Sequence, residues 1–151
     1  MDALRELYQE VILDHHKRPR NRREMPEASA KASGHNPLCG DRVSVFVKMD
    51  GDVLQDVSFV GTGCAISQAS ASMMTDCLKG RTREEIERVA SAFQRLVTDE
   101  HAAMPEGDDL VEKLEAFAGV REFPSRVKCA SLAWHALRAA LVQPDGTVST
   151  E

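Results

Sequence analysis

The sequence has no apolar run that approaches the roughly 18 residues of a membrane span, and its N-terminus lacks the apolar core of a signal peptide. It also has no excess of positive charge, because 19 Lys and Arg face 24 Asp and Glu for a net charge of −5. This balance argues against non-specific binding to nucleic acid. We therefore expect a cytoplasmic protein of one domain, residues 1–151, with a polar tail from about residue 144.

Cysteine is scarce, and its spacing lacks the CxxC pair that is the strongest local sign of a zinc site. The chain has 4 cysteines, which could be buried thiols, disulfide partners or metal ligands. A reducing compartment favours free thiols over disulfides. A role of the cysteines in metal binding or sulfur chemistry is therefore favoured over disulfides. Their spacing alone does not decide between buried thiols, disulfide partners and metal ligands.

Three of the cysteines and one aspartate stand at the ends of predicted elements. The segments are Cys39-Gly40-Asp41, Gly61-Thr62-Gly63-Cys64 and Arg126-Val127-Lys128-Cys129. Thiolates suit zinc or an iron–sulfur centre, and one carboxylate among three thiolates is compatible with tetrahedral zinc. These residues form our candidate metal site: Cys39, Asp41, Cys64 and Cys129.

A predicted β-hairpin brings most of this site together. Alternating valines predict a strand over residues 42–49, Asp50-Gly51 predicts a turn, and residues 53–60 predict a second strand. In an antiparallel pair the start of one strand lies beside the end of the next. We therefore expect Cys39, Asp41 and Cys64 to be neighbours. A weaker strand over 27–34 would complete a three-stranded sheet.

Helical periodicity surrounds this sheet with helices over residues 2–16, 65–79, 83–97, about 108–118 and 130–141. Thr82 and Glu85 form a capping box at the start of the third. The predicted fold is α+β, a small antiparallel three-stranded sheet packed against several helices, with the metal site at one end of the sheet. Cys64 and Cys129 would each precede a helix, where the dipole favours thiolate.

Helix geometry separates Cys77 from the site. It follows Cys64 by thirteen residues in one predicted helix, so a rise of about 1.5 Å per residue places the two roughly 20 Å apart. His35 lies in the loop before Cys39 and is a weak site candidate. The other histidines are expected at helix ends, on other helix faces or in solvent: His15, His16, His101 and His135. The basic run 17–23 indicates an exposed connector that could dock an acidic partner.

Four segments together resemble the SufU branch of the IscU/NifU family of iron–sulfur assembly proteins. They are residues 8–21, 36–41, 61–74 and 126–130. The resemblance spans nearly the whole chain and implies a fold like that of SufE and IscU proteins. Scaffolds of the family carry a histidine where this chain has Lys128, and they lack an added segment like the one at about 98–120. Both departures favour the SufU branch.

This resemblance implies a zinc-dependent sulfurtransferase that accepts persulfide sulfur from a SufS-type, pyridoxal-phosphate-dependent cysteine desulfurase. The sulfur would pass to a downstream iron–sulfur assembly scaffold. The four site residues would hold Zn²⁺, and Cys39 would accept sulfur after a desulfurase histidine replaces it on the metal. Arg126 would be a further catalytic residue, at the partner interface or the site rim.

Two other functions fit the same residues. Three thiolates and a carboxylate can hold a [2Fe–2S] cluster, as a scaffold protein would. The chain could also be a zinc-stabilised module that only binds and activates the desulfurase. The metal bound, and whether sulfur attaches covalently to the protein, separate these functions.

Overall fold

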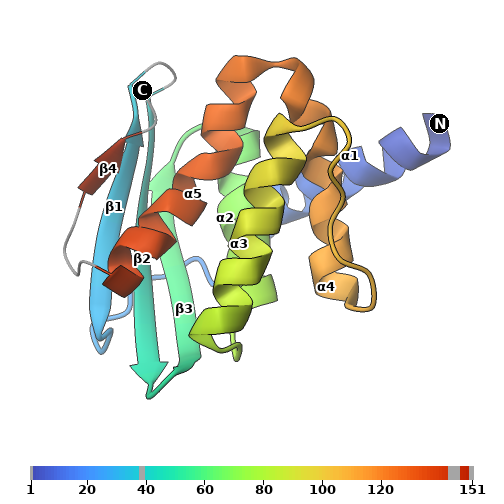
Figure 1. Cartoon of the computed structure of the whole chain (residues 1–151). Coiled ribbons are helices and arrows are strands. Elements are labelled where there is room, and N and C mark those ends of the chain that lie inside the picture. Colours follow the sequence, from blue (N-terminus) through green and yellow to red (C-terminus); the bar gives the residue numbers. More distant parts are fainter. Residues whose placement is uncertain (1, 38–39, 143–146, 150–151) are drawn as a thin grey trace.

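The computed structural model describes residues 2–37, 40–142 and 147–149. Figure 1 shows a sheet on one side of the molecule and the helices on the other. The elements follow in the order α1 (Asp2–Lys17), β1 (Ala30–Asn36), β2 (Asp41–Asp50), β3 (Val53–Thr62), α2 (Ala65–Leu78), α3 (Arg83–Thr98), α4 (Asp109–Glu112), the 3₁₀ helix η1 (Lys113–Glu122), α5 (Pro124–Val142) and β4 (Thr147–Ser149).

The three antiparallel strands of the prediction are present, and a short fourth strand joins them. The strand order is β3-β2-β1-β4, with β1 and β3 antiparallel to β2. β4 pairs with β1 in the parallel direction, although the sequence predicts only a polar tail in this region. The free backbone groups of β1 at the sheet edge explain this pairing, since an unpaired edge is a template for another strand.

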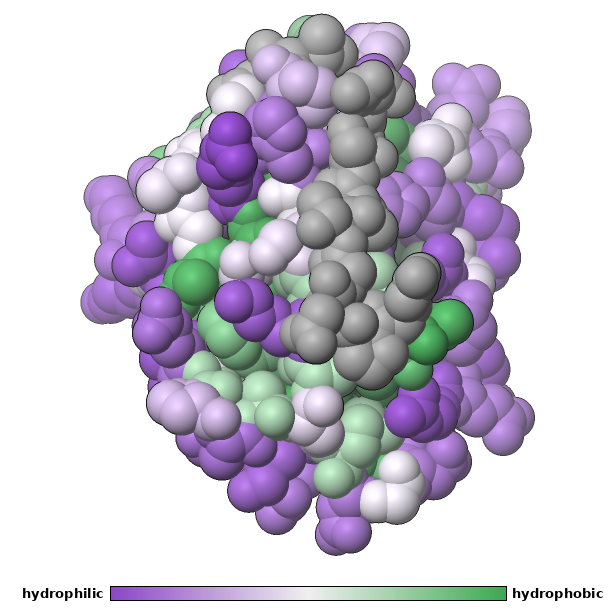
Figure 2. Space-filling model, turned by 90° about the vertical axis from the view of Figure 1, so that its left-hand side faces the viewer, coloured by the Kyte–Doolittle hydropathy of each residue, from purple (hydrophilic) through white to green (hydrophobic). Residues whose placement is uncertain are grey.

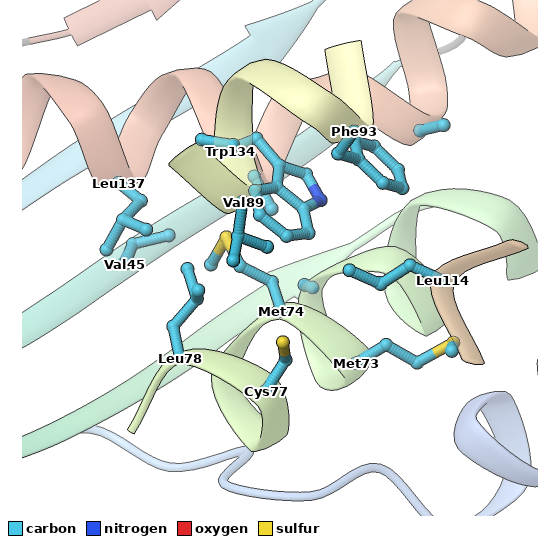
Figure 3. Close-up of a cluster of buried hydrophobic side chains, with 14 of the residues drawn as sticks. Val45, Met73, Met74, Cys77, Leu78, Val89, Phe93, Leu114, Trp134 and Leu137 are labelled. Atoms are coloured by element: carbon cyan, nitrogen blue, oxygen red, sulfur yellow. The ribbon is translucent and has the colours of Figure 1, made fainter. Parts of the chain in front are cut away.

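The helices cover one face of the sheet and form the core with it. α5 packs on β1 and β2, while α2 lies against β3, α1 and α5. Figure 3 shows Leu137 of α5 beside Val45 of β2, and Trp134 beside Phe93 of α3. The rings of Trp134 and Phe93 stack with centroids 4.5 Å apart. Figure 2 shows the left-hand side of Figure 1, where β4 and β1 lie, and this side carries hydrophilic residues around a paler, partly apolar centre.

Two helices differ from the prediction at their ends. The expected helix over 108–118 is a single α turn, α4, which continues as η1. Leu114, Phe117 and Val120 of η1 are all buried, and their spacing of three suits the three residues per turn of a 3₁₀ helix. α5 begins at Pro124 instead of residue 130, because proline is favoured at the first helical position. The capping box of α3 is confirmed.

The end of α1 and the basic connector fold back onto the molecule. His15 is 5% exposed, and its Nδ1 lies 2.7 Å from Ser72 Oγ on α2. The backbone N–H of Arg20 donates to the same hydroxyl. The prediction that His15 is a surface or capping residue is therefore wrong, because a tertiary contact buries it.

The basic residues of the connector mostly pair with acidic groups of this chain. Arg18 and Arg20 both contact Asp14, and Arg23 contacts Asp56. The positive charges of these connector residues are thus largely neutralised by ion pairs within the chain. Across the described ranges, no helix combines the length and the apolar content needed to cross a membrane.

Candidate metal centre

Three of the four predicted ligands converge at one end of the sheet. Asp41 is the first residue of β2, Cys64 caps the N-terminus of α2, and Cys129 belongs to α5. One donor atom from each lies within 4.8 Å of the others. The fourth predicted ligand, Cys39, lies outside the described residues. The hairpin register places Arg42, next to Asp41, opposite Thr62 near the end of β3, as the sequence predicts for neighbouring strand ends.

Backbone geometry holds Asp41 and Cys64 together. Asp41 is fully buried, and its Oδ1 accepts a hydrogen bond of 2.9 Å from the backbone N–H of Cys64. Gly63, at φ +147°, leaves room for this carboxylate, because a β-carbon there would collide with Asp41 Oδ1. Ser67 N–H then donates to Cys64 Sγ over 3.4 Å. The glycine and the first turn of α2 therefore place both donors.

Cys129 reaches the cluster in a different way from the predicted one. It is the sixth residue of α5 and is fully buried, so the prediction of a helix N-terminal position is wrong for this thiol. Asn36, which pairs with Asp41 across the sheet, donates from Nδ2 to Cys129 Sγ at 3.8 Å. The Cys129 sulfur also lies 3.5 Å from the carbonyl oxygen of Ser125.

The donor spacing fits a tetrahedral metal ion. Zinc binds sulfur at about 2.3 Å and carboxylate oxygen at about 2.0 Å, which places two such ligands about 3.5 Å apart on a tetrahedron. Cys64 Sγ and Asp41 Oδ2 are 3.7 Å apart. Two sulfurs and one carboxylate oxygen are also donors that zinc accepts. This end of the sheet is therefore a potential metal site.

The remaining sequence candidates lie elsewhere, and none joins this cluster within the described residues. His35 alternates with Asn36 and faces a shallow concavity of about 490 Å³ with Arg22 and Arg42, so it lies on the opposite face of the sheet from Asn36. Cys77 is buried in the core near Leu78 and Met74 (Figure 3), and burial raises the pKa of its thiol to about 11.

The last predicted functional residue, Arg126, is exposed in the first turn of α5. It lines a groove of about 950 Å³ between α1, η1 and the starts of α2 and α5. The apolar lining of that groove includes Tyr8, Ile12, Ile66 and Phe123. Sequence reasoning missed both the groove and Asn36. A strand prediction extended to residue 36 would have paired Asn36 with Asp41 and indicated its place.

Known proteins share this sequence and fold. A family model, the NifU-like N-terminal domain, matches residues 7–148. The chain is 40% identical to the zinc-dependent sulfurtransferase SufU of Bacillus subtilis, over 93% of this chain and 92% of that one. It is 41% identical to the iron–sulfur cluster assembly scaffold protein IscU of Streptococcus pyogenes, over 93% of this chain and 86% of that one.

A solved structure agrees with the sequence matches. The N-terminal part of a nitrogen-fixing NifU-like protein from Brucella abortus superposes with a TM-score of 0.80 at 28% identity, over 89% of this chain and 91% of that one. The resemblance inferred from the four sequence segments is thus confirmed at the level of the family. With a matching model over almost its whole length, and with relatives of about 40% identity, the chain belongs to the NifU-like N-terminal domain family.

Proposed function

We propose that this protein is a zinc-dependent sulfurtransferase of iron–sulfur cluster assembly, which accepts sulfur from a pyridoxal-phosphate-dependent cysteine desulfurase. The observation that carries the proposal is the convergence of the Asp41, Cys64 and Cys129 donor atoms within 4.8 Å of one another. Cys39, only two residues before Asp41, would be the fourth ligand. The Bacillus subtilis relative, named a zinc-dependent sulfurtransferase, supports the choice of zinc and of activity.

The chain's own groups prepare the site for this ion. When bound, Zn²⁺ would keep the coordinating thiols deprotonated at neutral pH. The Cys64 N–H fixes the Asp41 carboxylate, and N–H donors approach both Cys64 and Cys129. The site is therefore suited to keep Asp41, Cys64 and Cys129 in place while the fourth ligand is exchanged.

Sulfur transfer in this proposal is a thiol–persulfide exchange at Cys39. The Cys39 thiolate attacks the terminal sulfur of the persulfide on the desulfurase cysteine, and a new S–S bond forms on Cys39. The S–S bond on the desulfurase breaks, and its electron pair leaves on the desulfurase cysteine as a thiolate. Sulfur thus moves without any external oxidant or reductant, and Cys39 then delivers it to the downstream assembly scaffold.

The groove beside the metal centre supports docking of a protein partner. Ile66, in the first turn of α2, and Arg126, in the first turn of α5, lie on its walls, within three residues of Cys64 and Cys129. Phe123 lines the same groove and is 58% exposed. An exposed aromatic side chain beside an arginine is typical of residues that anchor an interface. A desulfurase seated there would have its reacting cysteine close to the site.

The test mixes zinc-loaded protein, without iron, with a cognate cysteine desulfurase and cysteine. Persulfide on each thiol is followed by mass spectrometry alongside desulfurase turnover. We expect persulfide on Cys39 and faster turnover, both lost in zinc-stripped protein and in Cys39→Ala. Cys77→Ala is the matched control, because this thiol is buried away from the site, and it should behave as wild type. Normal sulfur acceptance by Cys39→Ala would refute the assignment.

The scaffold function is the second candidate, because the Streptococcus pyogenes relative is named a cluster assembly scaffold. In the same experiment a scaffold would show no effect until iron is supplied, and would then develop the visible absorption of a [2Fe–2S] cluster. Faster turnover without bound sulfur would instead indicate a module that only activates the desulfurase. Each of these two results would replace the sulfurtransferase proposal.

A further inference from the structure

The two described thiols of the metal centre receive their hydrogen-bond donors from different sources. Cys64 is the N-cap of α2, so the free backbone N–H of Ser67 donates to its sulfur. The first backbone N–H groups of a helix have no partner within the helix, so a capping side chain can accept a hydrogen bond from them. Cys129 is the sixth residue of α5, where backbone N–H groups are already used within the helix. A donor to its sulfur comes instead from another element.

Asn36 is placed to supply that donor. It is the last residue of β1 and is fully buried. Along β1, Ala32, Gly34 and Asn36 alternate toward the helices, since all three are buried. A β-carbon on Gly34 would touch Leu132 of α5, which shows how closely the strand and helix approach. The Asn36 amide thus reaches Cys129 Sγ over 3.8 Å, across the contact between β1 and α5.

The Asn36 amide suits a sulfur that ligates a metal ion. Its nitrogen can only donate a hydrogen bond, and a metal-bound sulfur, which has no proton, can only accept one. The carbonyl oxygen of Ser125, 3.5 Å from the same sulfur, has no donor to offer it. The Asn36 N–H is thus a suitable partner for Cys129 Sγ in a metal site.

We propose that Asn36 is a positioning residue, which holds the Cys129 sulfur in its ligating orientation through an N–H···S hydrogen bond. The inference rests on the proposed metal site and adds to it a residue outside the ligand set. Partners that orient metal ligands in this way typically contribute about 10- to 100-fold in metal affinity. With Asn36 in place, Cys129 remains a fixed ligand while Cys39 carries the sulfur.

The test compares metal binding by the full-length wild-type protein, Asn36→Ala and Asn36→Asp. Asp has nearly the shape of Asn but no N–H donor, so it separates the hydrogen bond from the loss of volume. Zn²⁺ affinity is measured by competition with a chromophoric chelator, and Co²⁺ is used as a probe of thiolate-to-metal charge transfer. We expect both variants to bind Zn²⁺ about 10- to 100-fold more weakly, with a shifted charge-transfer band.

The matched control is His35→Ala, since His35 is the adjacent residue of β1 on the opposite face of the sheet. Its affinity and Co²⁺ spectrum should equal those of wild type. Wild-type affinity and an unchanged spectrum in both Asn36 variants would overturn the proposal, even if their urea midpoints fell. If wild type itself binds neither Zn²⁺ nor Co²⁺, the proposed metal site is refuted together with the role of Asn36. If it binds both but accepts no sulfur, only the sulfurtransferase proposal fails.

Discussion

The two ends of α2 carry the same side chain in opposite chemical settings. Cys64 caps the N-terminus, is only partly buried and receives an N–H from Ser67. Cys77, near the C-terminus, is 2% exposed and packs in the apolar core (Figure 3). One helix thus places one thiol in a polar cluster and seals the other away from water. The comparison teaches that position on the helix, more than residue type, decides which cysteine can do chemistry.

The largest effect expected from this contrast is in thiol alkylation of the metal-free protein. A pKa of about 11 leaves only about 0.1% of Cys77 as thiolate at pH 8, because each pKa unit is tenfold. Only the thiolate is the nucleophile, and burial slows the reagent further. We expect iodoacetamide to modify Cys64 at least about 100-fold faster than Cys77, as measured by peptide mass spectrometry.

A metal control sharpens that measurement. Adding Zn²⁺ before the reagent should protect Cys64 and leave the slow rate at Cys77 unchanged, since Cys77 is not among the residues that converge at the site. Full unfolding in urea should make the two rates similar. If Cys77 reacted as fast as Cys64 in the folded protein, the core would be more open than the structure indicates, and the contrast between the two ends would be wrong.

The next effect concerns the glycines that flank α2. Gly63→Ala should lower Zn²⁺ affinity by about 100-fold, because the added β-carbon collides with Asp41 Oδ1 and displaces a proposed ligand. Gly80, just beyond the other end of the helix, is the matched control: it also has positive φ, at +87°, but its β-carbon would meet nothing within 4 Å. Gly80→Ala should cost about 1 kcal/mol of stability at unchanged Zn²⁺ affinity. Equal affinities in the two variants would contradict this account.

The sequence predicts features that depend on neighbouring residues better than features that depend on distant ones. The hairpin, the capping box of Thr82 and Glu85, and the separation of Cys77 from Cys64 all follow from local spacing, and the structure agrees. Each of these is set by turn chemistry or helix rise within one or two elements. The local signals therefore predict the core of the fold and most of the convergence of the candidate ligands.

The missed features are tertiary. His15 looks like a helix-end cation in sequence, but its partner Ser72 is 57 residues away. The role of Asn36 appears only when β1 is placed against α5. The pairing of β4 requires a free edge on β1. The start of α5 is different, because Pro124 is a local signal for the first position of a helix.

The smallest expected effect is on the pH dependence of folding stability. It arises at the middle of α2, where His15 contacts Ser72. Burial, followed by the positive charge of Arg20, lowers the pKa of His15 to about 4, against about 6.5 in the unfolded chain. The unfolded state therefore takes up the proton first as pH falls below about 6.5, and folding stability is lost between that pH and about 4. From pH 7 to pH 5 we expect His15 to account for a loss of about 1–2 kcal/mol.

Urea unfolding at pH 7 and pH 5 checks this, with His15→Gln as the comparison because glutamine does not titrate. The pKa of His135 is also lowered by burial, but it is present in both proteins and cancels in the difference. Asp14, whose pKa is lowered to about 2 by Arg20 and Arg18, contributes stability that is lost only below about pH 4. We expect the wild type to lose more stability than His15→Gln over this range. Equal losses would mean that His15 is protonated in the folded protein and that its contact with Ser72 does not depend on a neutral ring.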